Sequence, residues 1–192
     1  MLSVVASLVL APTAPVNLIT NGNFELGRKW FSTQYAFSQD VQKEGTYVVG
    51  TDPKAHHPGA HSFGDHTTGR GQMLIVNGGS YAADAIWQST LKVAPDTMYE
   101  FSGWTTSWSM NPDDGTASDP APGRFQMYVD GQRIGAVHKV ESKSGVWNRF
   151  AITYKSPSDK PYVVVKIVNT NTSEIGNDFS IDDLAFTVKV EK

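Results

Sequence analysis

The chain has 192 residues, no cysteine, and a formal net charge of −3 from 16 Lys and Arg against 19 Asp and Glu. The lack of cysteine excludes a disulfide scaffold, a thiolate zinc site and a catalytic thiol. The slightly acidic balance argues against phosphate neutralisation as the main task, so we expect no nucleic-acid partner. With 17 Gly, 10 Pro and 11% aromatic residues, the composition favours many short strands joined by sharp turns.

The amino-terminal segment, residues 1–16, begins with ten apolar or small uncharged residues and then contains two prolines. It is too short to span a bilayer, which takes about 20 apolar residues. Its length fits the apolar region of a secretory signal peptide, but no Lys or Arg precedes it, and Pro15 would follow the expected cleavage site directly. We therefore favour an apolar arm that contacts another subunit or assembly partner, with a signal segment as the alternative. Residues 17–192 then form one domain.

From residue 16 onward, apolar and polar residues alternate with the two-residue period of half-buried strands. The clearest case is Phe125, Met127 and Val129, which we expect to face the core, followed by the hairpin signal Asp130-Gly131. Nine or ten strands without an amphipathic helix predict an all-β fold, an antiparallel two-sheet sandwich. The predicted strands that we bound by number are 34–40, 72–77, 86–93, 98–109, 124–130, 150–154, 162–168 and 179–190.

Two stretches, residues 51–71 and 110–123, are too long and irregular to be turns. Long loops on a sandwich often carry recognition. Their titratable residues match no zinc, nickel or EF-hand spacing, so we interpret them as solvated or packing side chains. These residues are His56, His57, His61 and His66 in the first loop, and Asp113, Asp114 and Asp119 in the second.

Two terminal segments resemble strands of bacterial carbohydrate-binding jelly rolls. Residues 17–25, Asn-Leu-Ile-Thr-Asn-Gly-Asn-Phe-Glu, resemble the opening strand, and residues 176–186, Gly-Asn-Asp-Phe-Ser-Ile-Asp-Asp-Leu-Ala-Phe, the closing strand. Between them, residues 65–73 resemble the Asp-His-Thr motif of the MAM domain, an adhesive jelly roll of animal surface proteins, although the MAM cysteines are absent. The resemblance covers about residues 17–186 and implies a galactose-binding-like or MAM-like jelly roll, extracellular or at the cell surface.

The resemblance also implies a structural cation between the first and last strands. Ca²⁺ takes six to eight oxygen ligands, many of them carboxylates. Because successive side chains of a strand point to opposite faces, Asp183 should share the inward face of Ile181, with Asp182 as outer support. The alternative is that these carboxylates are turn and cap residues that face water. The predicted ligands are Glu25, Asp65, Asp182 and Asp183.

Outward-facing residues of the predicted strands suggest a glycan-binding face. Sugar recognition needs an aromatic plate for the pyranose ring, and amide or guanidinium groups for its hydroxyls. In a jelly roll the candidates can share the concave sheet. The alternative is that Trp104 and Trp108 pack under loops, as we expect for Trp30, Trp87 and Trp147. The candidate ligand-binding residues are Gln88, Trp104, Trp108, Arg124, Gln126 and Tyr128.

The sequence contains no nucleophile elbow, zinc-protease motif, P-loop or Rossmann glycine pattern. The carboxylates expected of a glycosidase cleft lie instead mainly in loops and at the terminal strands. We therefore predict a non-catalytic surface module, glycan-binding or adhesive, with a structural Ca²⁺. One alternative is a structural assembly protein, such as a phage virion decoration protein or a filament subunit, that uses residues 1–16 for contact. Another is an accessory domain that has lost its enzyme.

Overall fold

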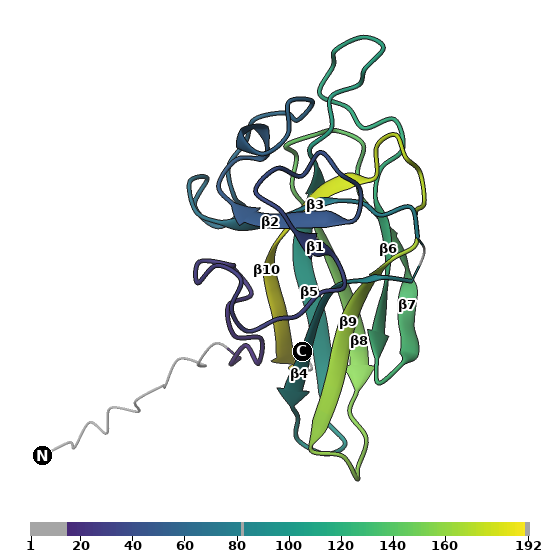
Figure 1. Cartoon of the computed structure of the whole chain (residues 1–192). Helices are drawn as coiled ribbons and strands as arrows, with labels where there is room; N and C mark the ends of the chain where they lie inside the picture. Colours follow the sequence, from purple (N-terminus) through teal and green to yellow (C-terminus); the bar gives the residue numbers. More distant parts are fainter. Residues whose placement is uncertain (1–14, 82, 191–192) are drawn as a thin grey trace, which may run out of the picture.

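The computed structural model describes residues 15–81 and 83–190 (Figure 1). Within these ranges the chain forms ten strands and one short 3-10 turn, η1 (Pro53–Ala55), so the all-β prediction is confirmed. Residues 1–14, most of the predicted arm, lie outside the described residues. The strands are β1 (Ala36–Phe37), β2 (Thr46–Gly50), β3 (Met73–Asn77), β4 (Ala85–Lys92), β5 (Met98–Ser107), β6 (Arg124–Val129), β7 (Gln132–Lys139), β8 (Asn148–Lys155), β9 (Tyr162–Asn169) and β10 (Asp178–Val188).

The strands form a jelly-roll sandwich of two sheets, as predicted. The larger sheet has the order β1-β2-β3-β10-β5-β8, and the smaller has the order β4-β9-β6-β7. The strand pairs are antiparallel except for the short pair β1–β2, which is parallel. The loops at residues 110–123 and 170–177 lie together at the upper end of the sandwich in Figure 1.

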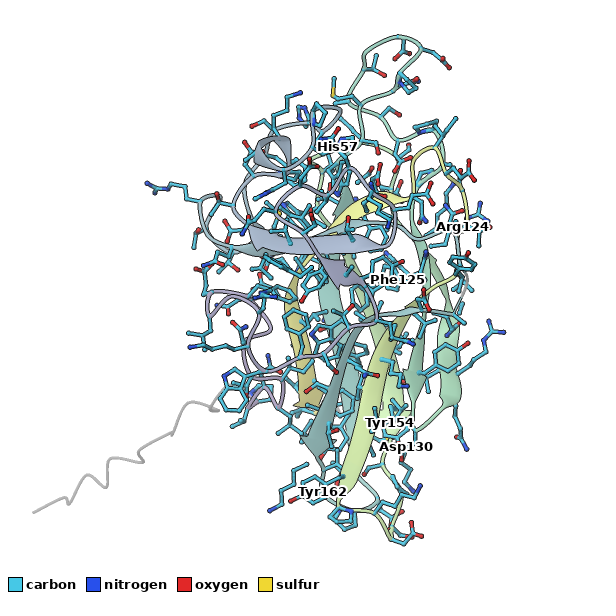
Figure 2. The ribbon with its side chains drawn as sticks, in the orientation of Figure 1. His57, Arg124, Phe125, Asp130, Tyr154 and Tyr162 are labelled. Atoms are coloured by element: carbon cyan, nitrogen blue, oxygen red, sulfur yellow. The ribbon has the colours of Figure 1, made fainter. Side chains whose placement is uncertain are left out.

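The main core lies between the two sheets. Phe125, Met127 and Val129 of β6 are at most 1% exposed, which confirms their predicted inward orientation. The ring of Phe125, labelled in Figure 2, points into this core. It lies 5.3 Å from the ring of Phe150 and 6.1 Å from that of Phe179, measured between centroids, and both partners belong to the larger sheet. Burial of each such side chain contributes about 1.5–3 kcal/mol. The aromatic contacts across the layers therefore hold the sheets together.

A second, smaller core lies on the outer face of the larger sheet. Its buried members come from β2 and the segment before it, from β3, from the residue that follows β5 and from the loop at 51–71. We call this cluster the outer core: Val41, Val48, Ala60, Met73, Ile75 and Trp108. Trp108 is fully buried, and its indole Nε1 donates a hydrogen bond to the carbonyl of Val76 at 3.1 Å. The loop therefore covers this part of the sheet and removes it from solvent.

Two strands were not predicted from the sequence. The strand β2 is buried on both faces: Tyr47 packs in the main core and Val48 packs in the outer core. A strand buried on both faces shows no alternation. β7 is an exposed edge strand with a weak apolar pattern. It pairs with β6 across Asp130-Gly131, whose φ angles of +49° and +79° suit a tight hairpin turn, so the predicted hairpin signal is confirmed.

Candidate ligand-binding face

Four outward side chains form a row across the smaller sheet, which we call the Tyr128 row. Tyr128 of β6 lies opposite Lys166 of β9 and Arg133 of β7, and Lys166 lies opposite Gln88 of β4. Directly opposed residues of neighbouring strands point to the same face. Tyr128, Lys166 and Gln88 are half-buried, and Arg133 is exposed. The row therefore presents an aromatic ring between an ammonium and a guanidinium group, with an amide at the β4 end.

A pocket of about 270 Å³ adjoins the row. Ala85 and Val168 give it an apolar base, and Tyr128, Lys166 and Gln34 line it as well. Gln34 is fixed against β4 by two hydrogen bonds: its Oε1 accepts from the backbone N–H of Ala85 at 2.7 Å, and its own N–H donates to the Ala85 carbonyl at 2.8 Å. An apolar base with a few convergent polar groups is typical of ligand pockets.

Gln126 faces this side of the sheet but is only 1% exposed, so its prediction as a direct ligand contact is corrected. The register between β6 and β7 shifts between Phe125 and Met127, and such a bulge leaves backbone carbonyls without strand partners. The Gln126 Nε2 donates to the carbonyl of Ile134 at 2.7 Å, and its Oε1 accepts from Arg133 Nη2 at 3.0 Å. Gln126 therefore positions Arg133, a residue that the sequence reading missed together with β7.

The six candidate ligand residues do not share one sheet, so that prediction is wrong. Gln88, Arg124, Gln126 and Tyr128 belong to the smaller sheet, whereas Trp104 lies in β5 of the larger sheet and Trp108 directly follows it. The cause is topological, because the chain passes from one sheet to the other between β4 and β5. Arg124 is the exposed first residue of β6, at the edge of the molecule in Figure 2.

Trp104 and Trp108 both pack under the loop at 51–71, as the alternative interpretation held. Trp108 is buried in the outer core. Trp104 is half-buried and stacks on His66, with ring centroids 3.9 Å apart and an interplanar angle of 16°. The prediction that a tryptophan packs in the fold also agrees with Trp87, which is 1% exposed, and with the half-buried Trp147. The same prediction is wrong for Trp30, which is 64% exposed.

The predicted inward orientation of Asp183 is wrong, and Asp182 lies on the outer side as predicted but is covered by the loop at 51–71. Asp182 is fully buried, and Asp183 is half-buried at the surface. Asp183 has a φ of +49°, and the pairing of β10 with β5 shifts between Asp182 and Ala185. This bulge inserts one residue, so that Ile181 and Leu184 both pack in the main core. Simple alternation therefore fails at Asp183.

Both carboxylates hold the loop against β10. Asp182 Oδ2 accepts from the backbone N–H of His66 at 2.9 Å and of Thr67 at 3.3 Å, and Asp183 Oδ2 pairs with His66 Nδ1 at 2.7 Å. Burial, together with the charge of Asp183, raises the pKa of Asp182 to about 7, although hydrogen bonds from backbone N–H groups oppose the shift. The observed role of these two residues is thus to fix the loop that carries His66.

The other two predicted ligands, Glu25 and Asp65, meet at Gly71. Asp65 is 3% exposed and accepts the Gly71 N–H at 2.8 Å, while Glu25 accepts the Gln72 N–H at 2.8 Å. Both side chains crowd the position that a Cβ on Gly71 would occupy. Burial acts to raise the pKa of Asp65, but hydrogen bonds from Gly71 and Thr68 outweigh it and hold the pKa below its usual value. Asp65 is therefore charged at neutral pH.

The four carboxylates thus lie in two pairs rather than in one cluster. Across residues 15–81 and 83–190, no group of three or more acidic or histidine side chains is arranged to hold a metal ion. In the same part of the chain, neither Glu25 nor Asp65 forms an ion pair with a basic residue. The pair at Gly71 therefore contains the buried carboxylate of Asp65 beside a second carboxylate, that of Glu25, with no basic partner in the described ranges.

No protein-family model matches the chain, and no curated protein matches it. Solved structures, in contrast, do match the chain. The CBM22-1 xylan-binding domain of Paenibacillus barcinonensis Xyn10C aligns with a TM-score of 0.56 at 14% identity, over 93% of this chain and 97% of that domain. The C-terminal family 22 carbohydrate binding module of Clostridium thermocellum Xyn10B aligns with a TM-score of 0.51 at 17% identity, over 86% and 90% of the two chains. The fold is that of a carbohydrate-binding-module jelly roll.

The same jelly roll also occurs in a catalyst. A cyclase from Fischerella sp. TAU, solved with 4-(1H-indol-3-yl)butan-2-one, aligns with a TM-score of 0.59 at 12% identity, over 92% of this chain and 99% of the cyclase. A shared fold does not carry a shared function, so the function must be inferred from the side chains of the site.

In the part of this jelly roll that the structure describes, no helix has the length and apolar character needed to cross a membrane.

Proposed function

We propose that the protein is a non-catalytic glycan-binding module that acts outside the cell and binds its ligand along the Tyr128 row. The observation that carries the proposal is an aromatic ring on an open sheet face, flanked by hydrogen-bonding groups and next to a pocket with an apolar base. Its likeness to a xylan-binding domain supports the ligand class. No residue of the row belongs to the main core or the outer core.

Each member of the row has a distinct task. The ring of Tyr128 stacks on the apolar face of a pyranose. The Nε2 of Gln88 donates to the Ser32 hydroxyl at 3.0 Å, so its Oε1 is the group that accepts a hydrogen bond from a ring hydroxyl. Lys166 and Arg133 donate hydrogen bonds, and neither is in an ion pair with an acidic residue of the described chain. Two unneutralised cations beside the ring favour a glycan that carries carboxylate groups. Binding should therefore weaken as salt concentration rises.

A glycan array with purified variants tests this proposal. Tyr128→Ala should lose binding with little change in melting temperature, because stacking contributes about 0.5–1.5 kcal/mol beyond buried area and the ring is not part of a core. Tyr162→Ala is the matched control, since Tyr162 is 56% exposed at the far end of β9 from Lys166 (Figure 2). Equal binding by wild type and Tyr128→Ala would contradict the proposed face.

We also propose a structural Ca²⁺ at the pair Glu25 and Asp65. The support is the buried, charged carboxylate of Asp65 beside a second carboxylate with no basic partner in the described ranges. A bound Ca²⁺ supplies positive charge that removes the repulsion between the two carboxylates.

The alternative function, a virion or filament subunit, depends on contacts made by residues 1–16 and remains a prediction.

A further inference from the structure

A second pocket, of about 440 Å³, lies at the end of the sandwich that carries the long loops. Its wall includes Glu44, His57, Glu174 and Asp178, together with apolar side chains such as Met110. His57 marks this end of the molecule in Figure 2. The pocket shares no residue with the Tyr128 row or its adjoining pocket, so an inference about it does not rest on the proposed function.

The carboxyl group of Asp178 is the unusual feature of this pocket. Asp178 begins β10 and is only 9% exposed. Its Oδ2 accepts a hydrogen bond from the hydroxyl of Ser109 at 2.7 Å, but its Oδ1 is buried and has no hydrogen-bond partner among the described residues. Leaving such an acceptor unsatisfied costs about 1–3 kcal/mol. A lining group with an unused acceptor indicates that a ligand donor completes the site.

The charge of the pocket indicates what kind of donor is missing. Glu44 and Glu174 line it with Asp178, and neither Lys nor Arg does. His57 adds no positive charge, because burial lowers its pKa and its Nδ1 accepts the Gly59 N–H at 3.0 Å. Burial raises the pKa of Asp178 well above its usual range, and the charges of Asp119 and Glu44 raise it further. A positively charged ligand would stabilise the ionised carboxylate of Asp178 and so offset the cost of burying its charge.

We propose that this pocket binds the primary ammonium group of an amino sugar, with Asp178 Oδ1 as its central acceptor. A metal ion fits less well, because the described acidic side chains do not cluster closely enough to share one. An ammonium group has three donors that point in different directions, and these suit acceptors spread around a wall. The apolar side chains of Met110 and Ile175 in the same wall suit the carbon face of a sugar ring.

Calorimetric titration of the full chain with glucosamine and N-acetylglucosamine tests the assignment. The two sugars share a ring and differ in the charge of the nitrogen. Glucosamine should bind, N-acetylglucosamine should not, and Asp178→Asn should weaken glucosamine binding about tenfold or more, since an amide cannot ionise beside the ammonium group. Asp113→Asn is the matched control, because it makes the same side-chain change at an exposed position in the adjacent loop outside the pocket. It should change binding by less than about twofold.

Three results would overturn the proposal: equal binding of both sugars, no effect of Asp178→Asn, or an equal effect of Asp113→Asn. If Asp178→Asn does not fold, as judged by circular dichroism, the double variant Glu44→Gln, Glu174→Gln decides. It should weaken glucosamine binding, and unchanged binding would count against the pocket. Tyr128→Ala separates the two proposals, because it should leave glucosamine binding intact. Loss of glucosamine binding in that variant would place the amino sugar on the row instead.

Discussion

The outer faces of the two sheets both carry aromatic residues at outward positions of their strands, but one face is covered by a loop and the other is open to solvent. On the larger sheet, outward residues such as Trp108 and Met73 are covered by the loop at 51–71 and become a second core. On the smaller sheet, the Tyr128 row stays open, and its residues are half-buried or exposed. An outward aromatic residue therefore binds ligand or stabilises the fold according to whether a loop covers it, and strand periodicity alone does not distinguish these outcomes.

The largest expected effect is that of Trp108→Ala on the covered face. Removal of a fully buried indole should lower the free energy of unfolding by about 3–5 kcal/mol, because it leaves a cavity in the outer core. Urea denaturation measures the change. A loss below about 1 kcal/mol would mean that the outer core is not a true core, and the contrast between the two faces would disappear.

Calcium removal should come next in size. An ion bound only by the folded state, at 100 times its dissociation constant, stabilises that state by about 2.7 kcal/mol. Chelation should therefore lower the melting temperature of the wild type, and Asp65→Asn should remove that dependence. Asp183→Asn is the comparison variant, because Asp183 pairs with His66 rather than with the carboxylates at Gly71. Identical melting curves with and without chelator would refute the site.

Trp104→Ala and Tyr128→Ala should behave as opposites. Trp104 stacks on His66 under the loop and is half-buried, so its removal should cost about 2 kcal/mol of stability and leave glycan binding unchanged. Tyr128→Ala should do the reverse. Paired thermal melts and glycan binding assays make the comparison, and loss of glycan binding in folded Trp104→Ala would shift the site to the larger sheet.

A smaller effect is expected from His138 of β7, whose side chain lies on the inner face of the smaller sheet. Its ring contacts Phe125 and Phe150, and burial lowers its pKa below the ordinary value of 6.5. Below pH 6.5 the unfolded chain therefore takes up a proton at this site more readily than the folded protein does, so stability falls as pH decreases. His138→Gln should flatten the stability profile between about pH 7 and 5. Parallel wild-type and variant profiles would show that the ring is protonated equally in both states.

The smallest effect on stability is expected from deletion of residues 1–15. The sandwich is built by strands that begin at Ala36, so the truncated chain should keep its melting temperature within about 0.5 kcal/mol of stability. If the arm mediates assembly, analytical ultracentrifugation should show a smaller species after deletion. Unchanged sedimentation would favour the signal-segment interpretation.

The sequence predicts the fold better than the site, for physical reasons. Alternation identifies the inward residues Phe125 and Met127, because each strand that faces solvent on one side repeats every two residues. The same rule fails at Asp183, where a residue with positive φ forms a bulge, and at Gln126, where a shift in register buries an outward side chain. Nor can it place Trp104, because which sheet a strand joins depends on pairing between segments distant in sequence.

The position of β10 has a consequence for the order of folding. This strand lies between β3 and β5 in the larger sheet, with Ile181 opposite both Leu74 and Thr105. Until residues 178–188 leave the ribosome, β3 and β5 each present an unpaired edge, and such edges invite aggregation. The contacts that close the sheet join residues about 70 to 110 positions apart, and contacts of this kind form slowly. The nascent chain therefore passes through a stage in which its larger sheet is split in two.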